Sequence, residues 1–184
     1  MANPISESTQ RLLDDMDPEA RAHAEREVAV NSVRAAGFKL SLAEEINLAK
    51  AIKVIAGVDG LSREELTGLK FLMIMSALPY DIQRHVVAFS TEGVTVEHAS
   101  ELFAAGSQKG CYLLSGATTV AAADGLSAEE EASARELGQR LKLADKLVNV
   151  LIAEARATGL AMRKGDPELV DELKRLRVAL FGYL

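Results

Sequence analysis

Asp59-Gly60-Leu61-Ser62-Arg63-Glu64-Glu65 is repeated 65 residues later as Asp124-Gly125-Leu126-Ser127-Ala128-Glu129-Glu130, and six of the seven positions are identical. At the same offset, further apolar residues correspond without a gap: Leu48 with Leu113, Ala56 with Ala121, Leu72 with Leu137 and Val86 with Leu151. Agreement at core positions over about 40 residues predicts an internal duplication. Repeated helical units usually pack around a pseudo-twofold axis, because each then buries its apolar face against the other.

Start and stop signals along the rest of the chain also predict helices. Asp17 before Pro18 is an N-cap followed by proline at the first helical position, and Ser41 with Glu44 forms a capping box. The expected helices span residues 18–36, 42–57, 63–78, 81–89, 96–105, 108–123, 128–143, 145–157 and 167 onward. The sequence therefore predicts an all-α fold, a duplicated bundle of about eight or nine helices, because no β-branched run suggests a sheet.

Three parts of the chain are expected. Residues 1–40 comprise a polar segment, 1–16, that is expected to be loosely held, and a helix after it. Residues 41–157 form the duplicated domain, with repeats at about 41–90 and 106–157. Residues 158–184 form an amphipathic C-terminal helix with leucines at helical spacing. We expect this helix to pack on the domain, and a homodimer contact or a contact with another protein are its alternative roles.

Composition limits the function. The net charge of −6 and the pI of about 5.2 argue against a nucleic-acid partner, because phosphate binding needs clustered Lys and Arg. The single cysteine, Cys111, fits a reducing compartment, and we expect it to be a buried apolar residue rather than a nucleophile. Neither a secretory signal nor an apolar stretch long enough for a membrane span is apparent, so a soluble, cytoplasmic protein is expected.

The two Asp-Gly turns admit two interpretations. In the structural one, each glycine ends a helix, and each Ser and the Glu three residues later cap the next helix. In the other, each turn gathers one Asp and two or three Glu within one helical turn, an oxygen-rich set that suits Ca²⁺, Mg²⁺ or Mn²⁺. An EF-hand is excluded, because with Gly125 as its sixth residue the first and third loop positions would be Val120 and Ala122.

The stretch Val120-Ala121-Ala122-Ala123-Asp124-Gly125-Leu126-Ser127-Ala128-Glu129-Glu130-Glu131 resembles the TerB-like, tellurite-resistance family, and residues 55–65 are a weaker copy. The resemblance covers about 41–157. It implies an all-helical duplicated fold, a cytoplasmic location, and an acidic surface for a divalent cation in stress-response assemblies. Carried onto this chain, the implied metal ligands are Asp59 with Glu65, and Asp124 with Glu130 or Glu131.

We therefore expect a non-enzymatic stress-response scaffold or sensor with a protein partner and a divalent cation. The alternative is a metal-independent interaction module that uses the C-terminal helix or an apolar groove near Lys70–Met75, although the first expectation for that run is core. An enzyme is not expected, because no nucleophile–base pair, phosphate loop or Glu-x-x-His motif occurs. His98 and Glu101 share a helical face and could pair, but a solvated or capping role is the first expectation for the histidine.

Overall fold

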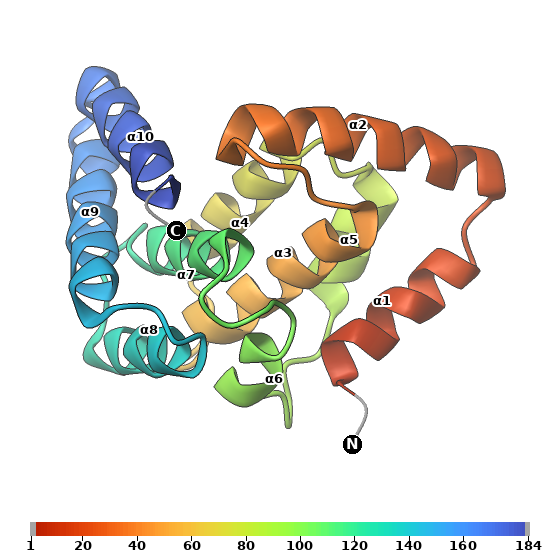
Figure 1. Cartoon of the computed structure of the whole chain (residues 1–184), viewed down its shortest axis with the longest axis horizontal. Coiled ribbons are helices and arrows are strands. Elements are labelled where there is room, and N and C mark those ends of the chain that lie inside the picture. Colours follow the sequence, from red (N-terminus) through yellow and green to blue (C-terminus); the bar gives the residue numbers. More distant parts are fainter. Residues whose placement is uncertain (1–2, 183–184) are drawn as a thin grey trace.

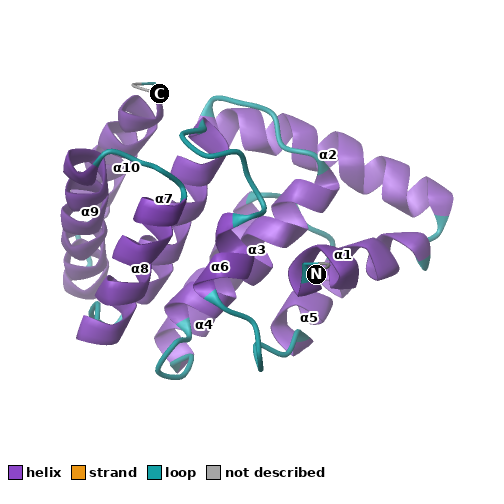
Figure 2. Ribbon diagram, turned by 60° about the horizontal axis from the view of Figure 1, so that its bottom comes forward, coloured by secondary structure: helices purple, strands orange, loops and turns teal. Residues whose placement is uncertain are grey.

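The computed structural model describes residues 3–182, which form ten helices and no strand (Figures 1 and 2). The all-α prediction is confirmed, with one helix more than expected. The helices are α1 (Pro4–Asp14), α2 (Pro18–Ala36), α3 (Leu42–Ala56), α4 (Arg63–Met75), α5 (Tyr80–Ala88), α6 (Val96–Ser100), α7 (Gln108–Ala121), α8 (Ala128–Arg140), α9 (Asp145–Lys164) and α10 (Pro167–Phe181).

The additional helix is α1, so the expectation of a loosely held segment over residues 1–16 is wrong for its described part; Met1 and Ala2 lie outside the described residues. Asn3 caps the helix, since its side chain accepts hydrogen bonds from the Ile5 and Ser6 N–H groups, and Pro4 occupies the first turn. Ile5 and Leu13 are buried. The signal was therefore present, because Asn-Pro here has the same function as Asp-Pro before α2.

Two helices differ in length from the prediction by more than three residues. The helix expected over 96–105 ends at Ser100, whereas the helix expected to end near residue 157 continues to Lys164 and stops at Gly165, whose φ is 68°. Gly159 lies within the extension, and a Cβ there would lie 2.0 Å from the Ala122 carbonyl oxygen. The extension of α9 thus approaches the end of α7 at a distance that only glycine allows.

The two segments that carry the repeat have matching helix boundaries. Helix α8 begins and ends 65 residues after α4, and α9 begins 65 residues after α5. Each of α4 and α8 is followed by a non-glycine residue with positive φ, Ala77 at 58° and Lys142 at 54°, again 65 residues apart. Such backbone values are uncommon outside glycine, so their recurrence at one offset indicates that the two segments adopt the same local conformation.

Helices α3 and α7 form the centre of the molecule, with α1 and α2 on one side and α9 and α10 on the other (Figure 1). Helix α10 is fixed by Phe181, which is buried and makes edge-to-face contacts with Phe38 and Tyr112. Arg177 adds an ion pair with the buried Glu154 of α9, with N and O atoms 2.7 Å apart. Leu180 also packs against the core, whereas Leu169 and Leu176 are exposed, so the aromatic cluster, the ion pair and Leu180 anchor α10.

None of the helices within residues 3–182 is long and apolar enough to cross a membrane.

Candidate functional site

The fold brings the two Asp-Gly turns together. One pocket of about 370 Å³ is lined by the same four positions from each turn: Asp59, Gly60, Ser62, Glu65, Asp124, Gly125, Ser127 and Glu130. The two turns are therefore not independent surface loops. They form the two halves of a single polar cavity between the start of α4 and the start of α8.

Capping explains how the glutamates reach this cavity. The Glu65 side chain accepts a hydrogen bond of 2.7 Å from the Ser62 N–H, and the Ser62 hydroxyl accepts one from the Glu65 N–H. Ser127 and Glu130 make the same reciprocal pair. The structural interpretation of the turns is therefore confirmed for these residues, and capping is also what turns each Glu inward.

Glu65 and Glu130 are both deeply buried, with 2% and 3% of their surface exposed. One oxygen of each is used by its capping bond, but Glu130 Oε1 is buried and receives no hydrogen bond from a donor within residues 3–182. Burial, together with the neighbouring Glu65 carboxyl, raises the pKa of Glu130 from 4.5 to about 8. Two carboxyls therefore face each other in this cavity, and no basic side chain is among the described residues that line it, a costly arrangement unless a proton or a cation lies between the carboxyls.

Asp59 and Asp124 line the same pocket from its exposed side. Each precedes a glycine with positive φ, 112° at Gly60 and 128° at Gly125, a backbone conformation that favours glycine. The glycines thus fix the turn. Of the residues that line the pocket, the two aspartates are the ones that neither form the turn nor cap a helix.

Glu131, also predicted as a ligand, lies outside this pocket. Its carboxylate pairs with Arg135, at 2.7 Å, and with Arg156. These arginines lower the pKa of Glu131, with the Arg135 hydrogen bond as the largest cause. Of the five predicted ligands, the structure thus gathers Asp59, Glu65, Asp124 and Glu130, and it leaves the fifth neutralised by arginine.

Within residues 3–182, no group of three or more His, Cys, Asp or Glu side chains is arranged to hold a metal ion. The pocket therefore contains a close pair of glutamates with an aspartate at each turn, and not a completed coordination shell.

Other predicted residues have structural roles. His98 accepts a hydrogen bond from the Thr95 N–H at 3.1 Å, so it caps α6, as expected. Cys111 is buried, and burial raises its pKa to about 12, so the expectation of an apolar core residue is confirmed. The core expectation for Lys70–Met75 is only half correct, since Met73 is buried whereas Phe71 and Ile74 are exposed.

Sequence analysis did not identify two buried charged residues of α3. Lys50 is fully buried and donates hydrogen bonds of 3.0 Å to the hydroxyls of Ser8 and Thr9, which holds α1 against α3. Glu45 is also fully buried and accepts a hydrogen bond from Ser76. Burial lowers the pKa of Lys50 to about 8 and raises that of Glu45 to about 7. Their charge alone did not distinguish them, because α3 also contains Glu44 and Lys53, which are only half-buried.

Comparisons of the chain with protein-family models, with curated proteins and with solved structures found no match. Any family assignment therefore rests on the residues quoted above.

Proposed function

We propose that this chain is a non-enzymatic, TerB-like scaffold or sensor in a bacterial stress response, which holds one divalent cation between its two Asp-Gly turns. The resemblance of residues 120–131 to TerB-like proteins supports the stress-response assignment. The matching boundaries of α4 and α8 support the duplicated fold that the resemblance implies. A cytoplasmic location is supported by the one cysteine, which is buried and unpaired and so suits a reducing compartment.

The orphaned Glu130 Oε1 is the observation that carries the cation proposal. A buried carboxylate oxygen without a partner is destabilising, and here a second buried carboxyl faces it. A divalent cation relieves both costs, because it takes the place of the proton that the pair otherwise keeps, neutralises both carboxylates and supplies the missing contact. The residues present therefore fit a cation better than they fit an anion or a neutral ligand.

The donor set favours a hard cation. Every side chain that lines the pocket offers oxygen, from Glu65, Glu130, Asp59, Asp124 and the two serines, and neither His nor Cys lies among them. Oxygen donors of this kind suit Ca²⁺, Mg²⁺ or Mn²⁺. Because the pocket is shared between the turns, the proposal assigns one cation to each chain, with the glutamates as its inner pair and the aspartates completing it from the open side.

Isothermal titration calorimetry with Ca²⁺, Mg²⁺ and Mn²⁺ tests the proposal. Binding is expected for the wild-type chain and lost in the Asp59→Ala/Asp124→Ala variant. The matched control is Glu64→Gln/Glu129→Gln, which also removes two carboxylates from the turns but from side chains outside the pocket. Absence of heat with all three cations at millimolar concentration, or equal loss in the control, would remove the cation from the proposal.

A second candidate is a metal-independent interaction module, and the exposed side chains of Phe71 and Ile74 on α4 favour it. This reading needs no ligand in the pocket. It predicts that partner binding is unchanged by EDTA and by the Asp59→Ala/Asp124→Ala variant.

A further inference from the structure

Helix α4 and the start of α5 expose four large apolar side chains. Their exposed fractions are 59% for Phe71, 60% for Ile74, 47% for Met75 and 72% for Tyr80. Phe71, Ile74 and Met75 share one helical face, because they are spaced by three and four residues. We refer to these four residues as the α4 patch. Scattered surface apolar residues are ordinary, but a run of this kind on one face is a mark of an interaction surface.

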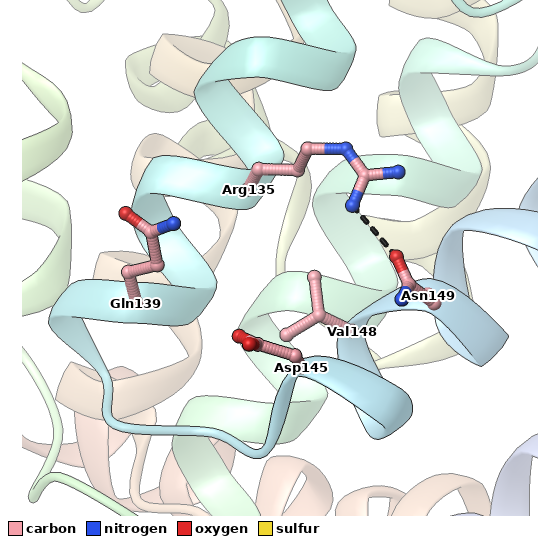
Figure 3. Close-up of a pocket in the computed structure, with 5 residues that line it drawn as sticks. All are labelled: Arg135, Gln139, Asp145, Val148 and Asn149. Carbon is pink, nitrogen blue, oxygen red and sulfur yellow. Dashed lines mark hydrogen bonds between the residues drawn. The ribbon is translucent and has the colours of Figure 1, made fainter.

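The second half of the chain shows that the fold does not require this patch. At the 65-residue offset, its members correspond to Glu136, Gln139, Arg140 and Asp145. There Glu136 and Arg140 form an ion pair of 2.8 Å, and Gln139 and Asp145 line a shallow cleft between α8 and α9 (Figure 3). The same backbone is therefore stable with a polar surface, and the apolar side chains of α4 have no structural role that their counterparts lack.

The charges beside the patch indicate what it binds. In the second half, Arg135 donates a hydrogen bond of 2.7 Å to Asn149 across the cleft (Figure 3). The corresponding residues of the first half are Lys70 and Arg84, which are both exposed. Neither forms any of the ion pairs found within residues 3–182. Two cations thus flank the apolar side chains, and Asp81 beside Tyr80 offsets only one of them.

We propose that the α4 patch binds an amphipathic helix of a partner protein, whose apolar stripe is flanked by Asp or Glu. The apolar stripe covers Phe71, Ile74 and Met75, and the acidic flank pairs with Lys70 and Arg84. A symmetric contact with a second copy is disfavoured, because it would bring these cations close to their own equivalents. An anionic membrane is disfavoured by the net charge of −6 on the whole chain.

This inference deepens the scaffold half of the proposed function and is independent of the cation. The test is selection from a phage-displayed library of helix-forming peptides against the full immobilised chain in EDTA, followed by fluorescence anisotropy of the selected peptides. The enriched peptides are expected to carry apolar residues at i, i+3 or i+4 and i+7, flanked by Asp and Glu. Their affinity should fall with salt.

The variant Phe71→Glu/Ile74→Gln gives α4 the residues of its α8 counterparts, so it is expected to fold and to bind the peptides about tenfold more weakly or worse. Lys70→Gln/Arg84→Gln should weaken binding and remove most of its salt dependence. The control, Leu160→Gln, removes an exposed apolar side chain of α9 and should leave binding unchanged.

Three results would overturn the proposal: no enriched helix, enrichment of basic helices, or affinity that does not depend on Phe71 and Ile74. Dimerisation in analytical ultracentrifugation, or binding to phosphatidylserine vesicles, that is lost in Phe71→Glu/Ile74→Gln would assign the patch to a second copy or a membrane and would equally overturn it. Because selection is done in EDTA, its failure is separate from a failure of cation binding in calorimetry.

Discussion

Replacing Glu130 by Gln is expected to stabilise the cation-free protein at pH 7, although the substitution removes a buried ionisable group that caps a helix. The amide oxygen can still accept the hydrogen bond from the Ser127 N–H, because Gln serves as well as Glu at this position of a capping box. The amide N–H₂ can donate to the facing Glu65 carboxylate. The substitution therefore keeps the cap and removes the carboxyl that the folded chain must keep protonated.

The size of the effect follows from the pKa of Glu130, which is raised from 4.5 to about 8 in the folded chain. Between these values the unfolded chain releases the proton and the folded chain keeps it, so the free energy of unfolding falls as pH rises. At about 1.4 kcal/mol for each pH unit, the wild-type protein loses about 3 kcal/mol between pH 4.5 and pH 7 through this group. The Glu130→Gln variant has no ionisable group at this position, so its stability does not fall in this way.

Urea denaturation of both proteins in EDTA, at several values between pH 4.5 and pH 8.5, measures the difference. The two stabilities should be similar near pH 4.5 and diverge as pH rises, with the variant about 2 to 3 kcal/mol more stable at pH 7. A variant that is less stable by the same amount at every pH would refute the reasoning, because it would mean that burial and the neighbouring Glu65 do not raise the pKa of Glu130 in the folded chain.

Three further predictions concern the stability of the fold. Between pH 8 and 10.5, the free energy of unfolding of the wild-type protein should rise by about 3 kcal/mol relative to that of a Lys50→Met variant. The reason is that burial lowers the pKa of Lys50 to about 8, so the folded chain loses the lysine proton in this range while the unfolded chain keeps it. Urea denaturation of both proteins across the range measures the difference. Gly159→Ala should cost about 3 kcal/mol or more in chemical denaturation, whereas Gly68→Ala, with its nearest neighbour at 3.9 Å, should be neutral or stabilising. Arg177→Met should cost about 3 kcal/mol because it leaves Glu154 buried and unpaired, and adding Glu154→Met should restore most of that stability in the same assay.

Most of the helices could be predicted because their ends are encoded locally. The capping boxes at Ser41, Ser62 and Ser127 place three helix starts at the residues expected. Helix α1 was missed because its few apolar residues are separated by polar ones, and only the Asn-Pro signal before it marked a start. The length of α9 was underestimated, because Gly159 lies inside the helix for its close approach to the end of α7, and the helix stops at Gly165 instead.

The candidate site was only partly predictable for the same reason. The offset of 65 residues identified Asp59, Glu65, Asp124 and Glu130 as equivalent pairs, but it could not show that they line one cavity. The offset pairs Glu131 with Leu66, but it could not show that Glu131 lies outside the cavity, since Glu130 and Glu131 both lie in the first turn of α8. Their different surroundings, a facing carboxyl for one and two arginines for the other, come from distant segments.

The stoichiometry of cation binding tests the central claim, that the two turns form one site. Titration of Mn²⁺ into the chain, followed by the electron paramagnetic resonance signal of the free ion, should give one bound ion for each chain. Asp59→Ala alone and Asp124→Ala alone should each weaken that same ion. Two bound ions, with each single substitution removing one and leaving the other intact, would contradict the shared site.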